Sequence, residues 1–337
     1  MQFPASHTFQ IVFARSRLAP FKTGTYTQSM NDRRVSAAAL AVAALCSASW
    51  FGAASLSAQA IQKQVYVSVV DQNGAAVPDL GPSDIVVRED NVAREVLRVA
   101  PADDPMQIAV LVDTSQTARN DISQIRQALP PFVEALTRPN EAGRKNEVAI
   151  ISFGERPTVM ADYSTNPGAL KKGIDRLWPL DGSGAYFLDA IVETVQGFRK
   201  REAQRPVIVA IVVEGRELSY RMYDQVLEPL RNSSAALHAL MIGQPVSGLS
   251  EETRSRNIVV DRGPTESGGS REQLLTSMAL AGKLKQLADQ LTHQYLVTYA
   301  RPQTLIPPER VTVGTTKPGL VARGTPVKDQ KPESRRP

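Results

Sequence analysis

Three oxygen-bearing side chains stand at alternate positions directly after an apolar run. Asp113, Ser115 and Thr117 follow Ile108–Val112. One carboxylate and two hydroxyls offer oxygen ligands with a single negative charge, which suits a hard cation such as Mg²⁺ or Ca²⁺. The same side chains could instead cap the next helix and bond the amides of the turn. The spacing alone therefore leaves two alternatives, a cation site and a capped turn.

The stretches around this motif predict a doubly wound α/β fold, with a mostly parallel sheet and helices on both faces. Short, nearly continuous apolar runs suit strands that are buried on both faces. These runs are Ile108–Val112, Val148–Phe153, Val207–Val213, Leu237–Ile242 and Tyr295–Ala300. The stretches with helical spacing of apolar residues are Asp121–Leu136, Pro167–Leu177, Phe187–Glu202, Tyr220–Asn232 and Glu272–His293. In such sheets ligands bind beyond the carboxyl ends of the strands, where the strand order reverses.

Two segments are expected to interrupt this pattern. Pro130 and Pro131 fall inside the first helical stretch and should kink or break the helix there. Residues 244–271 are rich in Gly, Ser, Pro and charged residues, which predicts a long loop.

A small antiparallel β unit is expected before the α/β part. Three strand-like stretches, Gln64–Val70, Ile85–Arg88 and Glu95–Val99, are separated by turn-forming Asn-Gly and Asp-Asn pairs. Three or four strands are too few to be stable alone. The unit should therefore pack on the α/β part.

The motif and three further stretches resemble a known family. The strand, the D-x-S-x-T motif and the following helix look like the opening of the von Willebrand factor A (VWA) fold and its metal-ion-dependent adhesion site. Residues 65–96 are similar to a strand module that precedes this fold in a group of bacterial exported "VWFA-related" proteins. Residues 291–302 and 309–324 are similar to the last helix–strand step and the closing strand pair of that group.

The resemblance implies a metal site built from three loops. Asp113, Ser115 and Thr117 match the first loop. The site would hold Mg²⁺ or Ca²⁺, weakly if at all, because a site with one or two carboxylates holds Mg²⁺ loosely without a partner's acid.

The other two loops depart from the family pattern. Ala185 stands where the second loop usually offers a Thr, and its methyl group cannot ligate a metal. Ser183 or Asp181 could substitute for that Thr. In the third loop Glu214 replaces the usual Asp, which in the family acts through a bridging water, so that the longer acid could be tolerated.

The N-terminal region predicts export. Arg33 and Arg34 precede the apolar run 38–44, and a small-x-small pattern ends at Ala60, as in a secretory signal peptide cleaved there. Met30 would then be the natural start. We expect a secreted or periplasmic protein; an uncleaved N-terminal membrane anchor is the alternative.

Charge and motif together divide the chain into segments. Of the net charge of +5, residues 1–60 carry five basic residues and one acid, and residues 301–337 carry eight and three. Residues 61–300, with 26 basic and 30 acidic residues, are mildly acidic, so a nucleic-acid partner is not expected.

The expected segments are an over-extended N-terminus at 1–29, a signal peptide at 30–60, a β-strand module at 61–104, a VWA-like domain at 105–302, a closing strand pair at 303–323 and a disordered basic tail at 324–337. The basic tail could touch an anionic envelope surface.

Rare residues exclude several classes of site. The chain has one cysteine, Cys46, and three histidines, His7, His238 and His293. These cannot build a disulfide framework, a zinc finger or a multi-histidine metal site. The chain also has no G-x-S-x-G elbow, no phosphate-binding loop with its Lys, and no run of ~20 apolar residues outside the leader.

Three functions remain open at this point. The first is an exported, non-enzymatic VWA-type module that binds another protein through the loops at Asp113, Ser183 and Glu214. The second is an Asp113-dependent, phosphatase-like enzyme, although position 115 is Ser where such phosphatases have Asp. The third is a structural envelope protein whose metal site does nothing.

Overall fold

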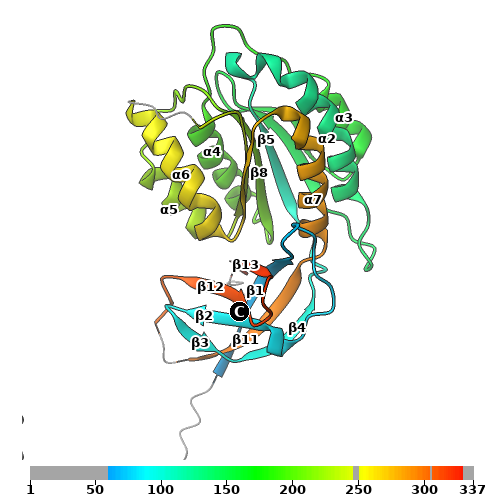
Figure 1. Cartoon of the computed structure of the whole chain (residues 1–337), viewed down its shortest axis with the longest axis vertical. Coiled ribbons are helices and arrows are strands. Elements are labelled where there is room, and N and C mark those ends of the chain that lie inside the picture. The colour runs from blue at the N-terminus through cyan, green and yellow to red at the C-terminus, as the bar shows by residue number, and fades with distance from the viewer. Residues whose placement is uncertain (1–59, 246–249, 304–305, 329–337) are drawn as a thin grey trace, which may run out of the picture. The chain divides into compact units, whose positions relative to one another are not determined.

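A computed structural model describes residues 60–245, 250–303 and 306–328 of the chain (Figure 1). All of these residues belong to one compact unit. Except for Ala60, the first residue of the first strand, the predicted signal peptide lies outside the described residues. No helix in the described part of the chain is both long and apolar enough to span a bilayer.

The centre of the α/β part is a six-stranded sheet with the strand order β10-β9-β8-β5-β6-β7. Every neighbouring pair is parallel except β6 and β7, which are antiparallel. The strands are β5 (Gln107–Val112), β6 (Glu147–Ser152), β7 (Thr158–Ser164), β8 (Pro206–Val213), β9 (Ala236–Ile242) and β10 (Arg271–Leu274). The predicted doubly wound fold with a mostly parallel sheet is confirmed.

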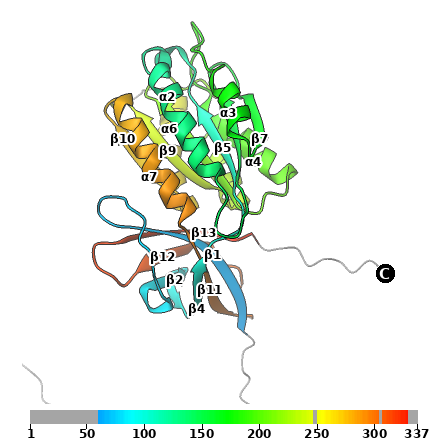
Figure 2. The same ribbon diagram turned by 90° about the vertical axis from the view of Figure 1, so that its right-hand side faces the viewer.

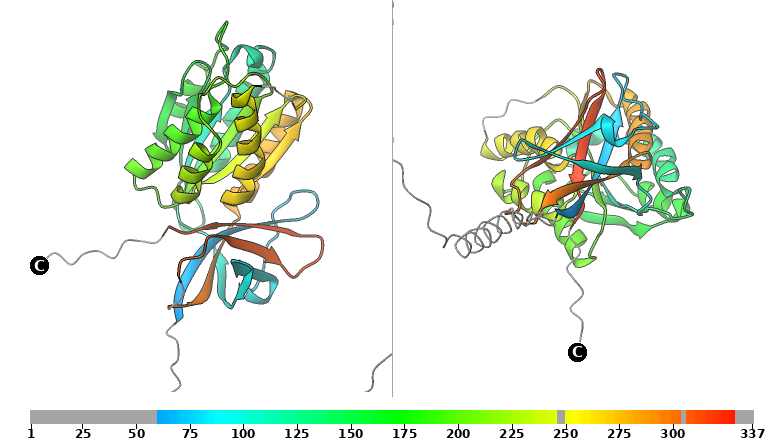
Figure 3. Two further views of the ribbon diagram at one scale, coloured as in Figure 1. Left: turned by 90° about the vertical axis from the view of Figure 1, so that its left-hand side faces the viewer. Right: turned by 90° about the horizontal axis from the view of Figure 1, so that it is seen from below.

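Helices cover both faces of this sheet. Along β5, Ile108, Val110 and Val112 face one core, and Ala109 and Leu111 face the other, as the twofold period of a strand requires. Helices α2 (Ile122–Thr137), α3 (Pro167–Ile174) and α7 (Leu280–Thr292) cover the first face (Figure 2). Helices α4 (Phe187–Lys200), α5 (Asp224–Ser233) and α6 (Glu251–Ser267) cover the second (Figure 3).

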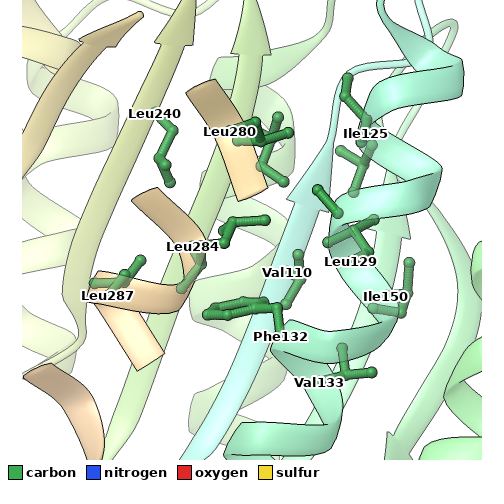
Figure 4. Close-up of a cluster of buried hydrophobic side chains, with 14 of the residues drawn as sticks. Val110, Ile125, Leu129, Phe132, Val133, Ile150, Leu240, Leu280, Leu284 and Leu287 are labelled. Carbon is green, nitrogen blue, oxygen red and sulfur yellow. The ribbon is translucent and has the colours of Figure 1, made fainter. Parts of the chain in front are cut away.

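Leucine and aromatic side chains of α2 and α7 fill the first core. Leu129 and Phe132 of α2 and Leu284 of α7 lie against Val110 in the middle of the sheet (Figure 4). Each is at most 2% exposed. Burial of this kind is the main force that holds helices on a sheet.

The predicted break in α2 is wrong. The helix continues through Pro130 and Pro131 to Thr137. The prolines are not fully buried, so the carbonyls that lose their amide donors are not sealed in the core. Leu129 before the prolines and Phe132 and Leu136 after them are fixed in the core, which outweighs the lost hydrogen bonds.

The predicted long loop at 244–271 is also wrong, because most of it forms helix α6. Ser250 caps the helix by accepting a hydrogen bond from the Thr253 amide, and acidic residues occupy the first turn. The composition concealed this helix because several of its buried residues are polar, including Ser255 and Arg256. The helix predicted at Glu272–His293 starts only at Leu280, since Arg271–Leu274 pairs with β9 as β10.

The antiparallel module is built from strands that precede the α/β part in the sequence and strands that follow it. One sheet has the order β13-β1-β11-β4 and the other β12-β2-β3. The strands are β1 (Ala60–Val70), β2 (Ile85–Glu89), β3 (Val92–Arg94), β4 (Val96–Pro101), β11 (Tyr295–Pro302), β12 (Val311–Thr315) and β13 (Val321–Pro326).

Two expectations change with this arrangement. The run Tyr295–Ala300 was expected in the parallel sheet, but β11 pairs with β1 and β4 in the antiparallel one. An apolar run indicates only that a strand is buried. Because β11 is a central strand of the antiparallel sheet, its composition does not distinguish it from a strand of the parallel sheet. Residues 324–326, expected in a disordered tail, complete β13 and pair with β1.

Candidate functional site

The candidate site lies where the strand order reverses. β5 is flanked by β6 on one side and β8 on the other, so the carboxyl ends of β5 and β8 border the crevice in which such folds bind ligands. Asp113 follows β5 and Glu214 follows β8. The sheet therefore brings together the first and third loops that the sequence singled out.

Asp113 joins the ends of these two strands. Its side chain is fully buried; Oδ1 accepts a hydrogen bond from the Ser115 amide (2.8 Å) and Oδ2 accepts one from the Val213 amide (3.0 Å). Burial raises the pKa of Asp113, while the hydrogen bonds from Ser115 and Val213 act in the opposite direction. Asp113 thus makes the hydrogen bonds to backbone amides that were expected if these side chains form a capped turn and not a cation site.

The hydroxyls of the first loop lie against the loop that follows β8. Ser115 Oγ and Thr117 Oγ1 are 2.7 Å apart and share a hydrogen bond. A Cβ atom at Gly215 would lie 2.6 Å from Thr117 Oγ1, closer than such atoms approach. Position 215 must therefore be glycine for the two loops to meet.

The second loop contributes its backbone to this edge. Ala185 is buried, and its amide donates to the Arg216 carbonyl (3.1 Å). The Ser183 carbonyl accepts from the Gln116 amide (3.4 Å), but the Ser183 hydroxyl donates to the Leu180 carbonyl (2.6 Å). Asp181 is exposed.

Asp181 forms an ion pair with Arg119 at the surface. The carboxylate of Asp181 and the hydroxyl of Ser183, the two candidates for the missing Thr, are thus each bound to a group other than the first-loop oxygens.

Glu214 pairs with an arginine that the sequence did not single out. Arg256 of α6 donates from Nη2 to Glu214 Oε2 (2.7 Å) and from Nη1 to the Gly215 carbonyl (3.0 Å). Arg256 is 1% exposed and Glu214 6% exposed, so the ion pair is buried. The guanidinium also bonds Asn257 Oδ1. Its charge acts to lower the pKa of Asp113, which places the cation near both acids.

A second buried acid, Glu217, lies in the same loop. Its Oε1 accepts from the amides of Ser219 (3.1 Å) and Leu188 (3.5 Å), so it sits at the N-terminus of α4, where a negative charge is favoured. Its Oε2 has no hydrogen-bond partner among the described residues. Burial raises the pKa of Glu217 to about 7, and Arg256 opposes that shift.

The donor set fits a divalent cation poorly. Mg²⁺ requires six oxygens and Ca²⁺ six to eight. Here both Asp113 oxygens accept backbone hydrogen bonds, Ala185 offers no side-chain oxygen, and Glu214 pairs with a guanidinium. Within the described ranges, no group of three or more His, Cys, Asp or Glu side chains is arranged to hold a metal ion.

Exposed apolar side chains surround this edge. In the part of the chain that the structure describes, twelve large hydrophobic residues are exposed, and seven of them lie in the segments that follow α3, β8 and β10 at the carboxyl edge of the sheet. These are Trp178, Leu180, Tyr220, Met222, Tyr223, Leu275 and Met278, which we call the edge hydrophobics. Leu180 reaches the first loop directly, because its amide donates to the Thr114 carbonyl (2.9 Å).

A doubly wound sheet with oxygen-bearing side chains at its reversal point is the arrangement in which α/β domains bind ligands. Residues 108–215 match the model of the von Willebrand factor type A domain. The resemblance of this part of the sequence to the VWA fold is confirmed. No curated protein matches the chain.

Several solved structures are similar to this chain. The von Willebrand factor type A protein from Catenulispora acidiphila is 10% identical, with a TM-score of 0.46 over 81% of this chain and 75% of that one. Proximal thread matrix protein 1 from the mussel byssus, with a zinc-occupied MIDAS motif, is 14% identical, with a TM-score of 0.43 over 63% and 50%. The vWF domain of the type V pilus tip protein Mfa5 from Porphyromonas gingivalis is 10% identical, with a TM-score of 0.42 over 56% and 96%. The chain spans half the length of the mussel protein.

Proposed function

We propose that the chain is an exported, non-enzymatic module that binds another protein through the loops at the carboxyl edge of its VWA domain. The observation that carries this proposal is that most of the exposed large hydrophobic side chains of the described residues are the edge hydrophobics, which lie along the carboxyl edge of the sheet. Aromatic residues and Met are enriched in protein interfaces, and exposed apolar groups that gather at one place mark interaction sites. Tyr220, 91% exposed, has the character of an interface anchor.

The environment of Asp113 supports a non-enzymatic role. A nucleophilic carboxylate needs an oxygen that a substrate can reach. Asp113 is fully buried, and each oxygen accepts a hydrogen bond from a backbone amide. These contacts favour a structural role for Asp113 over the phosphatase-like alternative.

Export is supported by the leader pattern that ends at Ala60 and by the absence of cysteine after Cys46, since a protein in an oxidising compartment gains nothing from a free thiol. N-terminal sequencing of the protein isolated from its native host tests this part. Ile61 is the expected first residue. A protein that begins at Met1 or Met30 would contradict cleavage after Ala60.

Binding is tested by comparing capture by three forms of the tagged full chain. The edge variant is Tyr220→Ser/Leu275→Ser/Met278→Ser. The matched control removes three equally apolar exposed residues of the β module, Val92→Ser/Leu97→Ser/Ile306→Ser. We expect one envelope protein to be captured by the wild type and the control and lost from the edge variant. Equal capture by all three forms would contradict the proposal.

A further inference from the structure

We infer that the Arg256 guanidinium supplies the positive charge that a divalent cation supplies in a metal-ion-dependent adhesion site, so that this VWA domain assembles its carboxyl edge without metal. The inference concerns the isolated chain and does not depend on the proposed protein partner.

The contacts of Arg256 carry this inference. Its Nη2 binds Glu214, the residue at the third-loop ligand position, and its Nη1 binds the carbonyl of Gly215. Gly215 in turn lies against Thr117 of the first loop. One guanidinium from α6 thus binds the loop after β8 and, through Gly215, supports the first loop, as a bridging ion would.

The charges around Arg256 explain why a cation is needed at this edge. Asp113, Glu214 and Glu217 are each at most 6% exposed, and an unpaired buried carboxylate is strongly destabilising. Arg256 pairs with Glu214 and acts to lower the pKa of both Asp113 and Glu217. A second positive ion at this point would be repelled by the guanidinium, because the buried surroundings screen the repulsion weakly.

The two departures from the family pattern complement each other. Ala185 removes a side-chain oxygen that the family's metal site uses, while Arg256 supplies a cation that needs none. Glu214 is one methylene longer than Asp and reaches α6, where it forms the ion pair. A guanidinium remains charged at all physiological pH values, so this cation does not dissociate.

The first test is a metal titration of the purified full chain. Melting temperature is recorded with Mg²⁺, Mn²⁺ or Ca²⁺ and with chelator. A bound ion at about a hundred times its Kd would raise the melting temperature by roughly 5–10 °C in a domain of this size. We expect no shift. A saturable rise that is lost in Asp113→Ala would overturn the inference.

The second test asks whether removal of the guanidinium creates a metal site. In Arg256→Gln, Glu214 loses its ion pair, and Asp113 and Glu217 lose the positive charge that acts to lower their pKa. We expect Mn²⁺ binding by this variant, measured by calorimetry or electron paramagnetic resonance. The gain should disappear in Arg256→Gln/Asp113→Asn.

The matched control is Arg205→Gln, an equally buried arginine at the opposite end of β8, which should bind no Mn²⁺. Mn²⁺ binding by the wild type that equals that of Arg256→Gln would contradict the inference, as would a folded Arg256→Gln that binds none. If Arg256→Gln does not fold, the wild-type titration alone decides.

Discussion

The two ends of strand β8 each hold a buried arginine, and the two have different kinds of partner. At the carboxyl end, Arg256 forms an ion pair with Glu214. At the amino end, Arg205 donates to the carbonyls of Ala102 (3.1 Å) and Asp104 (2.7 Å) and to Gln294 Oε1 (2.6 Å). Arg205 also stacks 4.6 Å above the ring of Tyr66.

This difference shows what each end of the sheet does. The oxygens that bind Arg205 are neutral and do not offset its positive charge, and burial lowers the pKa of Arg205 to about 10. Its contacts come from Tyr66 in β1, Gln294 before β11 and the segment before β5, so it joins the β module to the α/β part. Arg256 instead stabilises acids that lie at the ligand-binding edge. Arg205 joins the two parts of the fold, and Arg256 pairs with an acid of the candidate site.

The largest expected effect comes from breaking the ion pair. Arg256→Met leaves Glu214 charged and buried, and should lower the free energy of unfolding by about 3–5 kcal/mol at pH 7, as measured in urea. Arg256→Met/Glu214→Met should recover most of this loss, because two apolar residues replace the pair. A double variant as unstable as the single one would show that Arg256 acts through other contacts.

Glu217 adds a pH dependence to this end of the sheet. Its pKa rises from an ordinary value of 4.5 to about 7 on folding, so the folded state holds its proton more tightly. Stability from this group is fully present below pH 4.5 and is lost as the pH rises to 7, by about 3 kcal/mol in total.

The free energy of unfolding measured from pH 4 to 8 tests this window. Glu217→Gln removes the contribution, so the difference between wild type and variant isolates it from other groups, such as His238, whose pKa burial lowers to about 3. A difference that does not change with pH would contradict the shifted pKa.

Removing the arginine at the other end should cost less. Arg205→Met leaves carbonyl oxygens without donors but no unpaired charge, so we expect a loss of about 2–3 kcal/mol in urea. Arg205→Lys keeps the charge and should lose less. A loss equal to that of Arg256→Met would remove the distinction between the two ends.

The smallest expected effect is at the surface of the carboxyl edge. Tyr220→Ser should change the free energy of unfolding by no more than about 0.5 kcal/mol, because the side chain is 91% exposed. A larger loss would show that Tyr220 packs in the fold and is not available to a partner.

The sequence revealed the first loop because its three residues are contiguous with the strand that positions them. Burial on both faces likewise made β5, β6, β8 and β9 visible as apolar runs. Arg256 could not be found in this way. It lies 42 residues from Glu214 in the chain, on a helix whose buried face is partly polar, so no periodic pattern marks it. The only local signal was the cap at Ser250 followed by Glu251 and Glu252.

Ala185 and Glu214 were recognised as departures from the family pattern. What they imply depends on the contact that Arg256 of α6 makes with Glu214, which the sequence does not show. The pairing of β11 with β1 was hidden for the same reason, since strand partners distant in the chain leave no local mark.

The position of β1 between β11 and β13 has a consequence for synthesis on the ribosome. Both edges of β1 wait for partners that emerge only after the whole α/β part has been made. At about 5–20 residues per second, the roughly 225 residues between β1 and β11 take roughly 10–45 s to translate. During that time Val65, Val67 and Val69 belong to a strand with two open edges, which is a template for aggregation. Both edges of β1 therefore stay open until the last strands of the chain have been made.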